Sequence, residues 1–492
     1  MIRIENRVLR TQKNFWNHCL FHPTDAVEDA WGRRILDRMA KDRAVRSIRV
    51  YAMLEDIVYI GEEGELKYDF RLSDLRLDYL VGLGYDLVLA YAGIPDCLAS
   101  SLDGRTSNAK GGTRYKGKMW NTAPPKDISL WEEVCYEYTK HLVERYGEGM
   151  LSRWRCHCFN EPDEPSFFLA NLTKEDVGER VDAYFPMYEA FVRGVRRATA
   201  SIPVGGPALS DKMEFLEGFL SRVKASGVEL NYISLHFYGT RPAYLNAGER
   251  LSAVANANQQ KAKYEIIKRC GFGDTPIIAD EWGAATNGFF NSEECKILMF
   301  RETEVNSAYF VTLIDELMRS ELPVERLMIC LSGQHEMTED FTGFRNFFTL
   351  NFIAKPIYNS YVLTSRLYEN LLSASHDNEL VRVIPTRSDG GRYAVALTYA
   401  SEHFDEDIPE RFERVRFPED IVGRRVTVWC IDREHTNPYR LYQKMGISTP
   451  SEEQIRLLRE EGRLKPASEF VATDTDVEIT MTANSVFLIT VE

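Results

Sequence analysis

The stretch Arg153-Trp154-Arg155-Cys156-His157-Cys158-Phe159-Asn160-Glu161-Pro162 is the most informative part of this 492-residue chain. Its first part is rich in apolar residues and predicts a short buried β-strand, while its end places a carboxylate directly after that strand. The segment Ile277-Ile278-Ala279-Asp280-Glu281-Trp282 repeats this arrangement with a second acid, Glu281. Two acids at the ends of separate strands point to one shared site if both strands belong to the same sheet.

Apolar strand-like runs alternate with amphipathic helical stretches between residues 14 and 370. Near-continuous apolar strands separated by helices indicate a parallel sheet that is covered on both faces. Eight such repeats predict an α/β fold, a (β/α)8 or TIM barrel over residues 14–370, with its chemistry at the C-terminal ends of the strands. The strands are predicted within 14–20 and at 46–52, 85–90, 153–159, 202–206, 232–238, 276–281 and 326–332. The helices are predicted at 27–41, 72–82, 130–146, 177–199, 212–225, 250–270, 295–320 and 353–370.

The pattern changes after residue 371, where short segments of alternating polar and apolar residues predict β-strands. Asp389-Gly390-Gly391 is a plausible hairpin turn between two of them. A helix is predicted at 451–461 within this region. We therefore expect an accessory β-sandwich domain over residues 371–492, with residues 1–13 contributing a strand.

The bulk composition excludes several classes of protein. A formal net charge of −14 and the lack of any basic run argue against nucleic acid as a partner. No 18-residue apolar span predicts a membrane helix, and the N-terminus lacks the apolar core of a signal peptide. The nine cysteines form no disulfide framework, so free thiols in a cytoplasmic protein are expected. Cys156-His157-Cys158 has no second Cys/His pair to complete a zinc site.

Glu161 and Glu281 together predict hydrolysis of a glycosidic bond. This reaction needs one carboxyl group to protonate the leaving oxygen and a second to attack the sugar or to activate water. The alternative is structural, namely two strand-end acids that are each buried in an ion pair with a basic partner.

An ordered series of motifs resembles glycoside hydrolase family 39 of clan A, the family of β-xylosidases and α-L-iduronidases. The resemblance covers most of the chain, and the last of its motifs distinguishes this family from other clan A barrels. The motifs are Phe15-Trp16-Asn17, Tyr68-Asp69-Phe70 with Leu75, Pro124-Pro125-Lys126-Asp127 with Trp131, Glu144-Arg145-Tyr146-Gly147, Asn160-Glu161-Pro162, Gly205-Gly206-Pro207-Ala208, His236-Phe237-Tyr238, Glu281-Trp282 and Asp432-Arg433-Glu434-His435-Thr436-Asn437-Pro438-Tyr439.

The resemblance implies a retaining mechanism with Glu161 as acid/base and Glu281 as nucleophile. It also implies a non-catalytic β-sandwich. Glu336, which follows the eighth strand, resembles the family's acid that binds sugar hydroxyls, with an exposed loop residue as the alternative. No metal or organic cofactor is expected, because two carboxyl groups suffice for this chemistry.

Other candidate residues follow from their places on the predicted strands. Tyr238 is expected to donate a hydrogen bond to Glu281 and to lower its pKa. Asn160 is a candidate for the sugar 2-hydroxyl. His236 either contacts the sugar or the acid pair, or is a satisfied core histidine. Trp282 either stacks on a sugar ring or packs beneath a loop.

Two departures from the family's pattern bear on substrate specificity. The second strand reads Arg49-Val50-Tyr51-Ala52 where the family's xylosidases tend to have "RxHG", so Tyr51 replaces a histidine that would touch the sugar. After the eighth strand, Gly343-Phe344-Arg345 replaces a glycine-rich segment. Arg345 could pair with the carboxylate of a uronic acid. Alternatively, it faces solvent or pairs with Asp340.

The sequence as a whole predicts a retaining exo-acting glycosidase that removes a terminal sugar from plant-type oligosaccharides. A β-xylosidase-like activity is expected first, and α-L-arabinosidase, uronidase-like and transglycosylase activities are alternatives. A non-catalytic carbohydrate-binding barrel would be favoured by loss of either acid, and both acids are present. By analogy with the family, assembly through the C-terminal region would give a homo-oligomer.

Overall fold

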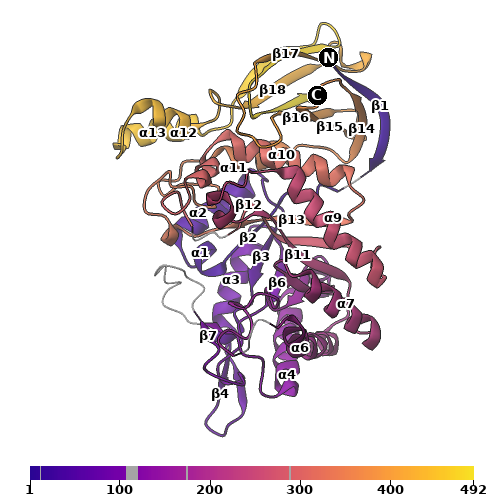
Figure 1. The fold of residues 1–492 in the computed structure, drawn as a ribbon, viewed down its shortest axis with the longest axis vertical. Coiled ribbons are helices and arrows are strands. Elements are labelled where there is room, and N and C mark those ends of the chain that lie inside the picture. The colour runs from indigo at the N-terminus through magenta and orange to yellow at the C-terminus, as the bar shows by residue number, and fades with distance from the viewer. Residues whose placement is uncertain (12, 107–119, 173–175, 287–289) are drawn as a thin grey trace.

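The computed structural model describes residues 1–11, 13–106, 120–172, 176–286 and 290–492. Its centre is a closed barrel of eight parallel strands, as predicted, in the order β10-β11-β12-β13-β2-β3-β6-β9 (Figure 1). Each strand falls on one of the predicted runs. The strands are β2 (His18–Phe21), β3 (Ser47–Tyr51), β6 (Asp86–Tyr91), β9 (Arg155–Cys158), β10 (Val204–Leu209), β11 (Tyr232–Thr240), β12 (Ile277–Ala285) and β13 (Val324–Leu331).

The predicted helices surround the barrel. They are α2 (Ala30–Lys41), α3 (Arg71–Gly82), α4 (Ile128–Tyr146), α6 (Val177–Ala198), α7 (Met213–Ser226), α9 (Ala253–Cys270), α10 (Glu304–Arg319) and α11 (Pro356–Thr364). Side chains such as Asp127, Asp176 and Ser252 begin their helices by accepting a backbone N–H.

Two helix predictions are too long. The segment predicted as a helix at 295–320 is divided at Thr303, whose side chain caps α10. A 3-10 turn, Lys296–Glu302, precedes the cap. The predicted helix 353–370 is only α11, and Asn370 already begins strand β14 (Asn370–Ser375).

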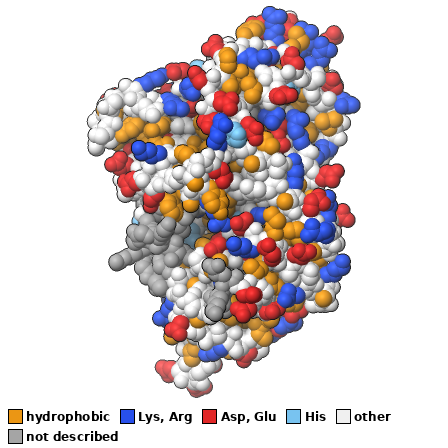
Figure 2. All heavy atoms as spheres, in the orientation of Figure 1, with side chains coloured by type: hydrophobic (Ala, Val, Ile, Leu, Met, Phe, Trp, Pro, Cys, Tyr) orange, Lys and Arg blue, Asp and Glu red, His pale blue; other side chains and the backbone are white. Residues whose placement is uncertain are grey.

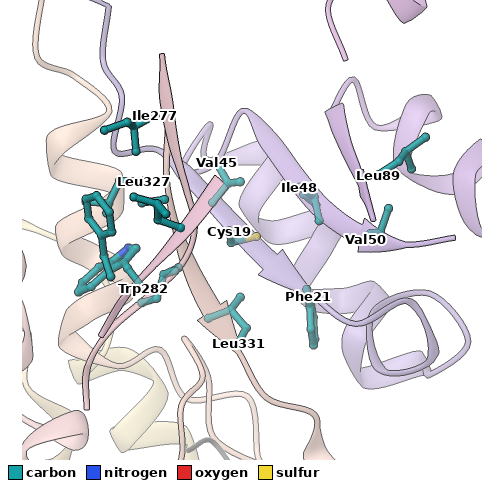
Figure 3. Close-up of a cluster of buried hydrophobic side chains, with 14 of the residues drawn as sticks. Cys19, Phe21, Val45, Ile48, Val50, Leu89, Ile277, Trp282, Leu327 and Leu331 are labelled. Atoms are coloured by element: carbon teal, nitrogen blue, oxygen red, sulfur yellow. The ribbon is translucent and has the colours of Figure 1, made fainter. Parts of the chain in front are cut away.

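Successive side chains of each barrel strand point alternately outward and inward, so they form two layers. Outward side chains such as Ile48 and Val50 of β3 and Leu89 of β6 belong to the large core between barrel and helices, part of which is shown in Figure 3. A small apolar layer of Val88, Tyr232, Ile278 and Met328 lies near the N-terminal ends of the strands and fills the barrel interior there. The inward positions further along the strands are therefore available for polar side chains at the opposite rim.

Strand β12 carries a bulge that decides which of its side chains face inward. Leu235 of β11 pairs with Ala279, but the next residue, His236, pairs with Glu281, so Asp280 is an extra residue in β12. A bulge of this kind re-aims the side chains that follow it. Asp280 and Glu281 both face the barrel interior as a result, and Trp282 faces the helices.

The C-terminal region forms the predicted β domain as one curled mixed sheet of nine strands rather than two separate sheets. Its order is β19-β18-β21-β16-β15-β14-β1-β17-β20. The N-terminal strand β1 (Ile2–Thr11) lies between β14 and β17, so the sheet contains both ends of the chain (Figure 1). The remaining strands are β15 (Val381–Arg387), β16 (Tyr393–Tyr399), β17 (Arg411–Arg416), β18 (Arg425–Ile431), β19 (Pro466–Val471), β20 (Asp476–Met481) and β21 (Ser485–Val491).

This domain packs on the barrel through α10 and α11. Two helices, α12 (Pro438–Met445) and α13 (Glu452–Glu461), are inserted between β18 and β19, and α13 confirms the predicted helix.

The nine cysteines carry free thiols, and seven of these residues are buried. Within the described ranges, no helix combines the length and apolarity needed to cross a membrane. Acidic and basic side chains are interspersed on the face shown in Figure 2.

Candidate active site

A pocket opens at the C-terminal ends of the barrel strands, where the sequence predicts the site. Residues of β2, β3, β12 and β13 line it together with residues of the loops that follow β2, β6, β9 and β13. Strand β12 continues to Ala285, so Glu281 lies within this strand rather than at its predicted end. The lining side chains and backbone come from Leu20, His22, Tyr51, Ala92, Gly93, Trp120, Asn121, Thr122, Phe159, Asn160, Glu161, Phe167, Glu281, Cys330, Leu331, Ser332 and Arg345. The two predicted acids therefore meet in one cavity.

The two carboxyl groups face each other at short range. An oxygen of Glu161 and an oxygen of Glu281 lie within 4.8 Å of each other and of a ring nitrogen of His236. Each glutamate is only 8% exposed. The backbone is left-handed at Phe159 (φ 63°) and at Glu161 (φ 46°), a conformation that costs free energy for residues other than glycine and that is found most often at functional sites.

Glu281 is surrounded by groups that favour its ionised form. Arg49 donates from Nη1 to Oε1 at 2.8 Å, and the Tyr238 hydroxyl donates to Oε2 at 2.6 Å. Burial by itself would raise the pKa of this carboxyl, but the charges of His236 and Arg49 and the Tyr238 hydrogen bond outweigh it and lower the pKa to about 2. Glu281 is therefore a carboxylate at neutral pH, and the predicted contact with Tyr238 is confirmed.

The pKa of Glu161 is shifted in the opposite direction, above its usual value. Burial raises its pKa, and the nearby charge of Glu281 adds to that effect, while His236 opposes it. His236 lies 2.7 Å from Glu161 Oε1 through Nδ1. Burial opposes the charged form of this histidine, but Glu281, Asp280 and Glu161 outweigh it and raise the pKa of His236 to about 9. Of the two predicted alternatives for His236, the structure thus shows contact with the acid pair.

Arg49 was not among the predicted site residues, yet it is central to the site. It is fully buried and donates to Glu281, to Asn160 Oδ1 at 2.6 Å and to His157 Nε2 at 3.1 Å. Its Nε also lies 3.1 Å from Asp280 Oδ2. A usable signal was present, because an arginine inside a strand that is buried on both faces requires acidic partners.

Asp280 and His157 were also missed as parts of the site. Both side chains are fully buried beneath the pocket, where they face Arg49 and His236. His157 points into the barrel while Cys156 and Cys158 pack on the outer side, as strand alternation predicts.

An aromatic cluster forms another part of the pocket wall. The ring centroids of His22 and Tyr51 are 5.2 Å apart, and that of Trp120 lies 5.8 Å from Tyr51. Tyr51 therefore lines the pocket as predicted, and His22 and Trp120 join it. Asn160 also lines the pocket, with its Oδ1 held by Arg49.

Trp282 corrects one prediction. It is fully buried, its ring stacks on Phe310 at a centroid distance of 5.3 Å, and Nε1 donates to the Tyr361 hydroxyl at 3.0 Å. Its side chain thus packs between the barrel and helices α10 and α11, rather than on a sugar ring or beneath a loop, because the bulge in β12 turns it away from the pocket. The backbone of Glu336 lies in a short 3-10 turn, Gln334–Glu336, but its side chain lies outside the described part of the chain.

Arg345 lines the pocket beside Glu281. Its Nη1 donates to the Tyr238 hydroxyl at 2.7 Å, and its guanidinium lies 5.6 Å from the centre of the Tyr238 ring. Asp340, the alternative partner, instead accepts hydrogen bonds from the backbone and side chain of Asn351. The sequence-based alternative of an Arg345–Asp340 pair is therefore wrong.

Glu161, His236 and Glu281 have a spacing that could suit a metal ion. A metal would require a neutral imidazole, so its binding would have to displace a proton from His236, whose pKa the surrounding acids raise to about 9. The chemistry of these three groups therefore fits proton transfer better than metal binding.

The chain resembles known proteins over nearly its whole length. The family model described as "Glycosyl hydrolases family 39" matches residues 1–478. A β-xylosidase from Caldicellulosiruptor saccharolyticus is 23% identical over 475 residues, which is 92% of this chain and 89% of that protein. Human α-L-iduronidase is 24% identical over 264 residues, 49% of this chain and 33% of that protein. The crystal structure of a monomeric β-xylosidase from Caulobacter crescentus CB15 matches with a TM-score of 0.82 at 21% identity, covering 100% of this chain and 99% of that one. At this identity the structural match supports the fold.

Proposed function

The chain belongs to glycoside hydrolase family 39, a family of retaining clan A glycosidases, and we propose that Glu161 and Glu281 are its acid/base and its nucleophile. The observation that carries this proposal is the pair of facing carboxyl groups with oxygens within 4.8 Å and with pKa values displaced in opposite directions. Retaining enzymes place the two carboxyl groups about 5–5.5 Å apart, whereas inverting enzymes need about 6.5–9.5 Å to admit a water molecule.

In the first step the Glu281 carboxylate attacks the anomeric carbon. Glu161 gives its proton to the glycosidic oxygen, the bond between that oxygen and the anomeric carbon breaks, and the sugar becomes esterified to Glu281. Arg49 and Tyr238 hold the two oxygens of Glu281 before the attack. His236 donates to Oε1 of Glu161, which leaves the other oxygen to carry the proton.

In the second step Glu161 takes a proton from water, and the water oxygen attacks the anomeric carbon and releases Glu281. Esterification has removed the charge of Glu281, which is one of the causes of the raised pKa of Glu161. The pKa of Glu161 therefore falls in the intermediate, as a base requires. The positive charge of His236 also stabilises the Glu161 carboxylate that this step uses.

For the substrate, we propose a terminal sugar of a neutral oligosaccharide, released by a β-xylosidase-like exo activity. The matching β-xylosidases align with more than nine-tenths of the chain. The aromatic cluster of His22, Tyr51 and Trp120 offers apolar faces for one sugar ring. An arabinosidase would use the same groups.

The pocket position of Arg345 favours one second candidate, a uronidase-like activity. A guanidinium near Glu281 can bind the carboxylate of a uronic acid. Transfer of the sugar to an acceptor other than water would use the same two glutamates.

Two variants and one substrate panel test these proposals. The Glu281→Ala variant should lose turnover and, with azide, form a glycosyl azide of inverted configuration. The Glu161→Ala variant should keep activity on substrates with good leaving groups and, with azide, form the retained azide. Undiminished turnover of aryl glycosides by Glu281→Ala, or of substrates with poor leaving groups by Glu161→Ala, would contradict the assignment. Nitrophenyl xylosides, arabinosides, galactosides and glucuronides, with and without an acceptor sugar, distinguish the substrate classes and reveal transglycosylation.

A further inference from the structure

Asp280 is a third carboxylate at the site, but it is not among the residues that line the pocket. The β12 bulge places it directly before Glu281 and on the same inner side of the barrel. In a regular strand, consecutive side chains point to opposite faces. Bulges next to active sites re-aim side chains in this way. The bulge thus buries an additional acid beneath the pair that faces the pocket.

Three basic side chains from three other strands surround Asp280. Its Oδ2 lies 3.1 Å from Arg49 Nε on β3 and 3.5 Å from His157 Nε2 on β9. Its Oδ1 lies 3.7 Å from His236 Nε2 on β11. All four side chains are 0% exposed. A fully desolvated acid is stable in its charged form only with such partners.

Two of these partners, Arg49 and His236, also reach the reacting carboxyl groups. Arg49 Nε lies 3.1 Å from Asp280 while its N–H donates to His157, and Nη1 donates to Glu281. His236 Nε2 lies 3.7 Å from both Asp280 Oδ1 and Glu281 Oε1, and Nδ1 contacts Glu161. One side chain therefore links the Asp280 carboxylate to each reacting carboxyl group: Arg49 to Glu281, and His236 to Glu161.

We propose that Asp280 is a positioning residue, which orients Arg49 against Glu281 and keeps His236 cationic against Glu161. The inference rests on the proposed roles of the two glutamates. Asp280 does not touch the reacting atoms, so it acts on both steps of the reaction only through Arg49 and His236.

The surrounding charges agree with this role. Burial raises the pKa of Asp280, and the charges of Arg49 and His236 oppose that rise. Glu281, Asp280 and Glu161 together raise the pKa of His236 to about 9. The pKa of His157 is lowered by burial and by Arg49, so His157 adds no positive charge.

The other titratable groups near this cluster contribute less to the charge on His236. Lys263 of α9 donates to the backbone carbonyl of His236 rather than to its ring. Tyr232 lies in the apolar layer below, and burial raises its pKa well above the usual value. Asp280 is therefore the buried acid that faces both Arg49 and His236 from beneath the pocket.

The test is the isosteric variant Asp280→Asn, compared with the wild-type enzyme by kinetics and by NMR of ¹⁵N-histidine. We expect the pKa of His236 to fall by roughly one unit or more, because a neighbouring negative charge is removed. We expect kcat to fall about 100-fold, the cost of displacing a catalytic group by about 1 Å. KM should stay within about threefold, because Asp280 makes no contact in the pocket. The variant His236→Gln identifies the His236 signal.

Asp315→Asn is the matched control. Asp315 of α10 is 4% exposed and also lies between two arginines, at 2.8 Å from Arg319 and 3.7 Å from Arg382. This change should lower stability but leave kcat and the His236 titration unchanged. If Asp315→Asn lost as much kcat as Asp280→Asn, the loss in both variants would reflect a less stable fold. That result would overturn the proposal.

A second variant keeps the proposal testable if Asp280→Asn does not fold. Asp280→Glu retains the charge but displaces it by one methylene, so His236 should still titrate near 9 while kcat falls. An unchanged kcat in both variants, or an unchanged His236 titration in a folded Asp280→Asn enzyme, would overturn the proposal. The azide products of Glu161→Ala and Glu281→Ala test the catalytic pair separately, so failure of either assignment can be recognised.

Discussion

The hydroxyl of Tyr238 donates a 2.6 Å hydrogen bond to Glu281 and accepts one of 2.7 Å from Arg345. A guanidinium is thus linked to the carboxylate through one hydroxyl. Because an accepted hydrogen bond from a cation makes the hydroxyl a better donor, this chain of contacts strengthens the hold on Glu281. The geometry gives Tyr238 a direct influence on the pKa of Glu281.

Replacing Tyr238 by Phe should raise the pKa of Glu281 and weaken catalysis. The tyrosine hydrogen bond is one cause of the low pKa of about 2. Activity requires ionised Glu281, so the acid limb of kcat/KM should move to higher pH. The loss of one hydrogen bond to a charged group, about 1.5–3 kcal/mol, corresponds to roughly a 10- to 100-fold lower kcat/KM. An acid limb at the wild-type position would contradict this prediction.

The two glutamates should affect stability with opposite signs. Glu161 has a raised pKa in the folded state, so its contribution to stability is lost as pH rises through that pKa. Glu161→Gln should therefore gain stability relative to wild type with increasing pH, by about 1.4 kcal/mol per unit of the shift. The measurement is thermal or urea unfolding between pH 4 and 8.

Glu281→Gln provides the opposite case for the same measurement. The pKa of Glu281 is lowered from 4.5 to about 2, so its contribution is present above the unfolded-state value and is lost as pH falls toward 2. This variant should lose stability at neutral pH, by about 3 kcal/mol at most. Changes of the same sign in the two variants would contradict the assigned pKa shifts.

His236→Gln should move the alkaline limb of kcat/KM to higher pH. The positive charge of His236 lowers the pKa of Glu161, which must be protonated for the first step. Removing that charge should raise the pKa of Glu161 further. The pH profile of kcat/KM on an unactivated substrate is the measurement, because such a substrate depends on the general acid. A shift to lower pH would show that His236 is neutral.

Arg49→Lys should be strongly deleterious although it retains the charge. One ammonium group cannot contact Glu281, Asn160 and His157 at once, as the guanidinium does. We expect kcat to fall about 100-fold, with loss of stability. Arg76→Lys is the matched control, because Arg76 is 2% exposed and also pairs with two acids, Glu28 and Asp56. It should lose stability but keep kcat, and equal kcat losses would indicate a purely structural Arg49.

The sequence was sufficient for the barrel and for the acid pair. Strand and helix periodicity are local patterns, so the eight repeats and their order could be predicted from the chain itself. The parallel strands then bring their C-terminal ends to one rim, and Glu161 and Glu281 follow from that placement. Tyr238 was predictable for the same reason, since it lies two residues beyond His236 on one strand face.

Only the tertiary structure revealed the buried groups that set the charge of this pair. The inward direction of both Asp280 and Glu281, and the outward direction of Trp282, depend on a bulge in the pairing of β12 with β11. The partners of Arg49 on β3 come from β9 and β12, two strands that are far from it and from each other in the sequence. Register and bulges arise from pairing between distant segments and from packing on both sides of the sheet, and no local pattern of residues encodes them.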